Sequence, residues 1–145
     1  MTSISIELII DFICPWCYLG KSRIDRIQKQ LADELAIEVN LKPYLLHPYI
    51  PKGGLPKEQF AKKTKHGFGR ALKMETGIEG ININYHKISV VPSSLEAYRL
   101  LALTPQKLKS AMTNQIFYAY FEEGLDIENH DVLIQIAKSV GYFRF

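Results

Sequence analysis

The sequence predicts an α/β fold in which a strand–helix–strand unit is followed by a mainly helical segment. Every second residue is apolar over residues 4–10 and 37–41, as in strands, and apolar residues recur at helical spacing between these two stretches. Helical periodicities predominate after residue 54. With 145 residues, of which 47% are hydrophobic and 23% charged, the chain has the size and composition of one compact domain.

The strand–helix–strand unit is predicted element by element. Its first strand covers residues 4–10, where Ile or Leu at every second position forms one well-buried face. Its second strand covers residues 37–41, and Pro43, which lacks a backbone N–H, ends the pairing. Two strands joined through one helix are expected to lie parallel, with a right-handed crossover. The apolar face of that helix is predicted to carry Ile24, Ile27, Leu31 and Leu35.

A loop and two short helices are expected next. The Pro-rich and Gly-rich stretch 45–54 indicates irregular backbone. Short helices are predicted at residues 59–65 and 68–75, interrupted by Gly67 and Gly77.

Three longer helices complete the predicted elements. They begin near Ser94, Pro105 and Asp131, the first with a capping box made by Ser93 and Glu96, and the last with Asn129 or His130 as its cap. The second and third are expected to end at the glycines Gly124 and Gly141.

The two cysteines, Cys14 and Cys17, follow the first strand and open the first helix. Unpaired N–H groups and the positive dipole end of a helix favour a thiolate at this position. Cys14 is therefore predicted to be an exposed nucleophile with a pKa below about 8.5, and Cys17, one turn later, to be the thiol that resolves a mixed disulfide. Pro15 suits the first helical position and stiffens the active turn. Trp16 offers an aromatic surface that either contacts substrate polypeptide or covers the edge of the turn, and both residues are assigned to substrate binding.

Other uses of the polar and aromatic residues are weighed against this interpretation. A zinc site is not expected, because there is no second cysteine pair and the histidines are isolated, and thiol chemistry needs no cofactor. Asp11 is expected to cap the active turn rather than to move protons, and His47 to be a loop residue rather than a base. Tyr118, Tyr120 and Phe121 are interpreted as helix packing rather than as a ligand pocket.

Charge and hydropathy exclude several partners. The formal net charge of +3 comes from basic residues interleaved with acidic ones, so no nucleic-acid-binding surface is predicted. No apolar run approaches the roughly 18 residues that a membrane span requires. Residues 1–10 include Glu7 and lack a basic region like that of a signal peptide, which predicts a cytoplasmic protein.

A family resemblance becomes visible at the cysteine pair. Residues 11–21, Asp-Phe-Ile-Cys-Pro-Trp-Cys-Tyr-Leu-Gly-Lys, resemble the opening of the DsbA-like oxidoreductases, and specifically their FrnE-like branch. Residues 77–82, 93–101 and 117–127, and the stretch to Gly141, are also similar to that branch. The resemblance implies a thioredoxin-like domain with a large helical insertion, in which residues 1–54 form the N-terminal βαβ part and residues 55–145 the insertion subdomain.

The same resemblance implies the chemistry. Cys14 attacks and Cys17 resolves, on dithiol or disulfide substrates that are proteins or low-molecular-weight thiols. The family closes its thioredoxin core with further strands after the insertion, one of them preceded by a cis-proline that faces the cysteine pair. No such segment follows Gly141, so the C-terminal strands of the core are predicted to be absent, through truncation, a frameshift or completion by another chain. Pro92 precedes a helix and is not given the cis-proline role; the open sheet suggests a homodimer.

Two other functions remain open at this stage. Glutathione-dependent isomerases and transferases that resemble 2-hydroxychromene-2-carboxylate isomerase share the fold but typically place serine where this chain has Cys14. A binding domain or an inactive truncated remnant would be indifferent to the loss of Cys14. The predicted function is that of a protein disulfide oxidoreductase.

Overall fold

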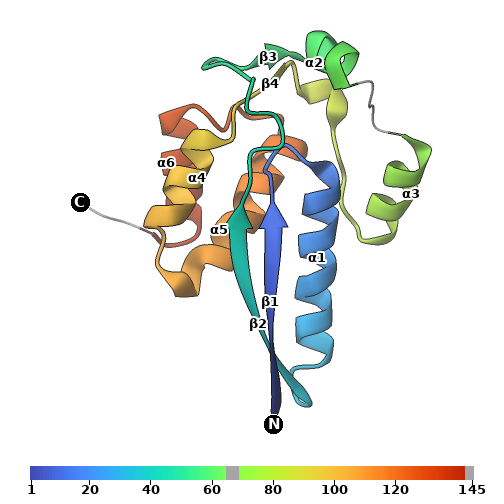
Figure 1. Ribbon diagram of the computed structural model, residues 1–145, viewed down its shortest axis with the longest axis vertical. Helices are drawn as coiled ribbons and strands as arrows, with labels where there is room; N and C mark the ends of the chain where they lie inside the picture. Colours follow the sequence, from blue (N-terminus) through green and yellow to red (C-terminus); the bar gives the residue numbers. More distant parts are fainter. Residues whose placement is uncertain (65–68, 143–145) are drawn as a thin grey trace.

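The computed structural model describes residues 1–64 and 69–142. A strand–helix–strand unit comes first along the chain, and mostly helices follow (Figure 1). The elements are β1 (Thr2–Ile10), α1 (Pro15–Gln30), β2 (Leu35–Pro43), β3 (Leu55–Pro56), α2 (Lys57–Thr64), α3 (Arg70–Ile78), the 3₁₀ helix η1 (Tyr85–Lys87), β4 (Val90–Val91), α4 (Leu95–Leu103), α5 (Gln106–Phe121) and α6 (His130–Ser139).

The parallel pairing of β1 with β2 confirms the predicted βαβ unit. The register runs from Thr2 opposite Leu35 to Ile10 opposite Pro43, so both strands are longer than the sequence pattern indicated. Figure 1 shows α1 alongside β1, with the N-terminus of α1 at the same end of the sheet as the C-terminal ends of the strands. The residues that follow β1 are thereby delivered directly to the start of α1.

The predicted apolar face of the first helix is wrong at its C-terminal end. Leu31 is the C-cap of α1, with its N–H bonded to the carbonyl of Ile27, and Leu35 belongs to β2. The chain turns back directly after the cap, because the amides of Glu34 and Leu35 both donate to the carbonyl of Leu31. The buried side chains of α1 come from its first two turns instead, which are the turns closest to the cysteines: Tyr18, Leu19 and Lys21.

An aromatic cluster fixes α1 and the end of β1 against the helical segment. The Phe12 ring lies 5.1 Å from the Phe117 ring and 5.5 Å from the Tyr98 ring, measured between centroids. Tyr18 stacks on Phe117 at 5.2 Å and on Phe121 at 5.9 Å. Because Phe12 and Tyr18 flank the cysteine pair in sequence, this packing sets the position of the pair relative to α4 and α5.

The two short helices confirm the expected elements but not their boundaries. Gly77 lies inside α3, so the break predicted there is wrong; the helix ends beyond it, where Gly80 takes a left-handed φ of 73°. The predicted positions 65, 67 and 68 lie outside the described residues. The antiparallel β3–β4 ladder was not predicted, because two-residue strands leave no alternating pattern to detect.

The longer helices are placed as expected, with one difference in capping. The Asn129 side chain caps α6 by accepting from the amides of Asp131 and Val132, at 2.8 and 3.2 Å. Gly124 and Gly141 take the left-handed φ values of 69° and 81° expected of helix-ending glycines. The capping box proposed at α4 does not form: the Ser93 hydroxyl accepts from the Leu95 amide at 3.3 Å, and Glu96 pairs with Arg99 and His130.

No helix within residues 1–64 and 69–142 has both the length and the apolar character needed to cross a membrane.

The division of the chain into an N-terminal part, residues 1–54, and an insertion subdomain, residues 55–145, stays a prediction.

Lys21 is a buried cation that the sequence pattern did not reveal. Its side chain is 1% exposed, and Nζ donates to both carboxylate oxygens of Asp25 at 2.6 and 2.8 Å. Nζ also donates to Ser110 Oγ at 2.8 Å and Asn114 Oδ1 at 3.1 Å on α5. Burial lowers the pKa of the ammonium, while the Asp25 carboxylate opposes that shift. The network ties α1 to α5 one turn beyond the cysteines.

We expect Lys21→Met to lower the free energy of unfolding by about 2 to 3 kcal/mol, because it leaves the Asp25 carboxylate without its cation and two polar groups of α5 without their donor. Urea denaturation followed by far-ultraviolet dichroism measures the change. Lys29→Met, at an exposed position of the same helix, is the matched control and should change stability by less than about 0.5 kcal/mol. Equal effects of the two substitutions would contradict a structural role for the buried network.

Candidate active site

The active turn is anchored by the carboxylate of Asp11, which is 1% exposed. Its Oδ1 accepts from the Ile13 amide at 3.1 Å and from the hydroxyl of Ser94, and its Oδ2 accepts from the Leu46 amide at 2.9 Å. The Asp11 carbonyl also accepts from the Cys14 amide at 3.0 Å. These contacts agree with the predicted capping role and extend it, because Asp11 joins the turn to the 44–54 loop and to the start of α4.

Cys14 is the N-cap of α1. Its backbone is extended, with φ −94° and ψ 109°, and its Sγ accepts from the Cys17 amide at 3.3 Å. Pro15 occupies the first helical position, as predicted, so the helix begins without an N–H to satisfy there. The helix therefore presents an amide hydrogen to the Cys14 sulfur, which favours negative charge on that atom.

The two thiols share a hydrogen bond and titrate as a pair. This bond lowers the pKa of Cys17 to about 7, an effect that burial partly opposes. The same bond, together with burial, raises the pKa of Cys14 well above its ordinary value, because Cys14 then holds the shared proton. The sequence predicted a lowered pKa for Cys14, whereas in this arrangement it is the pKa of Cys17 that is lowered. The first deprotonation belongs to the pair, and one thiolate is available near neutral pH.

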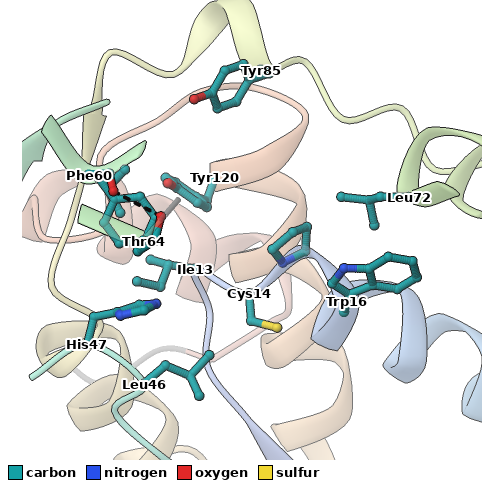
Figure 2. Close-up of a pocket in the computed structure, with 12 residues that line it drawn as sticks. Ile13, Cys14, Trp16, Leu46, His47, Phe60, Thr64, Leu72, Tyr85 and Tyr120 are labelled. Atoms are coloured by element: carbon teal, nitrogen blue, oxygen red, sulfur yellow. Dashed lines mark hydrogen bonds between the residues drawn. The ribbon is translucent and has the colours of Figure 1, made fainter. Parts of the chain in front are cut away.

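A cavity of about 320 Å³ opens beside Cys14. Figure 2 shows the Cys14 sulfur among side chains that come from several parts of the chain. The active turn contributes Ile13, Pro15 and Trp16, and the last of these is 50% exposed. Cys17 is not among the residues that line the cavity. Of the two sulfurs, only that of Cys14 therefore has direct access to a group held there.

The other walls were not predicted from the sequence. The loop of residues 44–54, between β2 and β3, contributes Leu46 and His47. The remaining lining residues follow it in the chain: Phe60 and Thr64 on α2, Leu72 on α3, Tyr85 on η1, Val91 on β4 and Tyr120 on α5. Interpreting Tyr120 as helix packing alone is wrong, because this buried side chain also faces the cavity. His47 lies in the loop as expected, with its ring edge-on to Phe60 at 4.9 Å. Aromatic residues downstream of a Cys-x-x-Cys pair are a weak signal, since most of them pack in the core.

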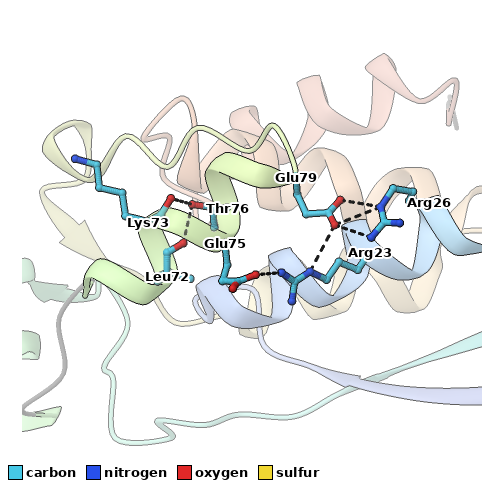
Figure 3. A network of polar contacts seen from close by, with 7 residues as sticks. All are labelled: Arg23, Arg26, Leu72, Lys73, Glu75, Thr76 and Glu79. Atoms are coloured by element: carbon cyan, nitrogen blue, oxygen red, sulfur yellow. Dashed lines mark hydrogen bonds and ion pairs between the residues drawn. The ribbon is translucent and has the colours of Figure 1, made fainter.

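An ion-pair network lies between α1 and α3, the helix that carries Leu72 (Figure 3). Arg26 pairs with Glu79 at 2.9 Å, and Arg23 pairs with both Glu75 and Glu79. The Arg26 hydrogen bonds hold the pKa of Glu79 below its usual range, with Arg23 adding to the effect. α3 is therefore docked on α1, the helix that carries the cysteines.

Within residues 1–64 and 69–142, no group of three or more His, Cys, Asp or Glu side chains is arranged to hold a metal ion. Both cysteines are present as free thiols.

Comparison with known proteins gives a consistent result. The sequence profile of the DSBA-like thioredoxin domain matches residues 5–144. A protein named YwbO from Bacillus subtilis (strain 168), itself uncharacterized, is 25% identical in an alignment 145 positions long, which covers 96% of this chain and 67% of that protein.

Two solved structures share the fold. A probable DsbA oxidoreductase from Streptomyces coelicolor superposes with a TM-score of 0.78 at 21% identity, covering 94% of this chain and 62% of that one. The cytosolic disulfide reductase DsbM from Pseudomonas aeruginosa, solved with GSH, gives a TM-score of 0.66 at 17% identity and covers 96% and 66% of the two chains. The present chain thus spans less than two thirds of the length of either structure.

The shared hydrogen bond predicts an unequal titration of the two thiols. Absorbance by the thiolate in the ultraviolet should show one thiolate forming with a midpoint near pH 7, while the second thiol ionises only well above the ordinary pKa of a cysteine. In denaturant, both should ionise near about pH 8.5, since the pair is no longer held together. Two equal steps near the ordinary value in the folded protein would rule out the shared proton.

Proposed function

Because the chain belongs to the family of DSBA-like thioredoxin domains, we propose that it is a thiol–disulfide oxidoreductase with Cys14 as nucleophile and Cys17 as resolving thiol. The observation that carries this proposal is the position of Cys14. Its sulfur caps α1, accepts from the Cys17 amide and borders the cavity. These are the conditions that a reactive thiolate needs: a stabilised charge and an open path to substrate.

The reaction begins with the proton that the two thiols share. When Cys17 holds it, the charge resides on Cys14 Sγ, where the Cys17 amide stabilises it. This thiolate attacks one sulfur of a substrate disulfide, forming a mixed disulfide with Cys14 and releasing the other substrate sulfur as a thiolate. Cys17 then passes its proton to the released substrate thiolate and attacks Cys14 Sγ, which breaks the mixed disulfide and releases the second substrate sulfur as a thiolate. The substrate gains two electrons, and the protein is left with a Cys14–Cys17 disulfide.

The reverse sequence oxidises a substrate dithiol with the protein disulfide. Cys14 lines the cavity and Cys17 does not, so we expect Cys17 to meet the mixed disulfide rather than the incoming substrate. Trp16 and Pro15 border the site of attack and provide the surface against which a substrate polypeptide packs.

We further propose that the substrates are protein or low-molecular-weight thiols and disulfides, handled in the cytoplasm. Support comes from the cysteine content, a single Cys-x-x-Cys pair of the kind that is catalytic rather than structural in a reducing compartment, and from the cytosolic disulfide reductase DsbM, which shares the fold. Neither a metal nor an organic cofactor takes part in the exchange described.

Substituting each cysteine separates the two roles. The reduced protein should reduce the disulfides of insulin, and Cys14→Ser should abolish this activity because no nucleophile faces the cavity. Cys17→Ser should instead accumulate a mixed disulfide at Cys14, visible by mass spectrometry as a covalent adduct that dithiothreitol removes.

The same samples distinguish the proposed oxidoreductase from a glutathione-dependent transferase and from a binding domain. Glutathione conjugation to an electrophilic aryl halide that survives Cys14→Ser would indicate a glutathione-dependent transferase. A binding domain would retain its properties in both variants and reduce nothing. Adduct formation at Cys17 in the Cys14→Ser variant, at the rate of the unsubstituted protein, would contradict the assignment of the nucleophile.

A further inference from the structure

The cavity beside Cys14 carries no charge among its described lining residues apart from the cysteine itself. None of them is Asp, Glu, Lys or Arg, and His47 is the one other group there that can ionise near neutral pH. Ile13, Leu72, Val91 and Tyr120 are buried and form its inner surface. A carboxylate placed inside would lose its hydration without gaining a cation among the described lining residues, and an ammonium would meet no anion among them except the cysteine pair itself, whereas an apolar group would be stabilised.

The hydroxyl groups that face the cavity do not alter this preference. Thr64 Oγ1 already donates to the Phe60 carbonyl at 3.0 Å, within α2 (Figure 2). Burial raises the pKa of Tyr120, which therefore stays neutral. Apart from Cys14 and His47, the described lining residues offer only neutral groups to a ligand.

The volume limits what can enter. An apolar cavity of about 150 Å³ accommodates benzene, so about 320 Å³ holds one large side chain but not an extended peptide. Exposed apolar side chains lie around the active turn and the adjoining loop: Trp16 is 50%, Leu46 44% and Tyr49 44% exposed. An apolar rim of this kind suits the rest of a polypeptide chain, which would lie across it while one side chain enters.

Resting on the function proposed above, we propose that the cavity beside Cys14 is a specificity pocket for one uncharged, bulky apolar side chain adjacent to the reacting cysteine of a polypeptide disulfide. Cys14 attacks the sulfur of that substrate cysteine while the neighbouring side chain of the substrate occupies the space between Phe60, Leu72 and Tyr120. Preferred substrates therefore carry an aromatic or large aliphatic residue beside the cystine, and charged neighbours are disfavoured.

Basic residues outside the pocket make a separate contribution. Lys57 Nζ lies 4.3 Å from the centroid of the Tyr85 ring, and Lys63 Nζ lies 4.4 Å from that of Tyr49. Neither lysine lines the cavity, but their charge would attract acidic groups near its mouth. A test must therefore vary the size of the neighbouring side chain at constant net charge, and vary its charge separately.

Symmetric disulfides of N-acetyl-Cys-Xaa-amide provide such a test, with Phe, Ala or Asp as Xaa. The second-order rate constant for reduction by the reduced protein is measured from peptide thiol released, separated by chromatography. We expect the Phe peptide to react about tenfold faster than the Ala peptide, which has the same charge, and the Asp peptide to react no faster than the Ala peptide.

Variants of residues that line the pocket test whether the preference for the Phe peptide over the Ala peptide arises there. Leu72→Trp, which fills the space, should reduce the Phe-to-Ala ratio at least about threefold, and Phe60→Trp is a second variant should the first fail to fold. Leu103→Ala, at a position 70% exposed on α4, is the control and should leave the ratio unchanged. The ratio is independent of the fraction of active protein.

Each outcome has one meaning. Equal rates for the Phe and Ala peptides, or a ratio that Leu72→Trp leaves intact, overturn the pocket but not the oxidoreductase activity. The fastest rate with the Asp peptide would show that the lysines outside the pocket govern selection, which also overturns it. Failure to reduce any of the three peptides contradicts the proposed function itself.

Discussion

The buried carboxylate of Asp11 is the interaction on which the arrangement of the site depends. It accepts hydrogen bonds from the Ile13 amide in the active turn, the Leu46 amide in the following loop and the Ser94 hydroxyl at the start of α4. A buried carboxylate is tolerated only when its oxygens are satisfied in this way. The need to satisfy one group therefore brings the active turn together with two segments that lie 35 and 83 positions from Asp11 in sequence.

Reactivity and selectivity come from different parts of this arrangement. Reactivity is local: the Cys14 sulfur, the Cys17 amide and the shared thiol proton all belong to the first turn of α1. Selectivity is not local, because the walls of the cavity come from the loop after β2 and from α2, α3 and α5. The aromatic packing of Phe12 on Phe117 and the ion pairs between α1 and α3 hold those walls over the cysteines. Sequence changes in the helices can thus alter substrate choice without touching the dithiol.

The features predicted correctly are those with a short-range signature. The parallel β1–β2 pair follows from alternating apolar residues, and the start of α1 from a proline behind a capping side chain. Features that depend on distant partners were missed. Lys21 has the sequence pattern of a surface lysine until Ser110 and Asn114, 89 and 93 positions away, supply its acceptors. Tyr120 lies on the mostly apolar buried face of α5, so periodicity alone does not show that it borders a cavity.

Whether Cys14 and Cys17 form a working redox couple is measured by the equilibrium between their dithiol and disulfide forms in glutathione buffers of graded composition. Trp16, the one tryptophan of the chain, lies between the two cysteines and can report the change by fluorescence. The account predicts a single reversible two-electron transition within the range of about −270 to −120 mV found for related active sites, with both thiols lost together. The absence of a transition, or the formation only of disulfides between chains, would contradict it.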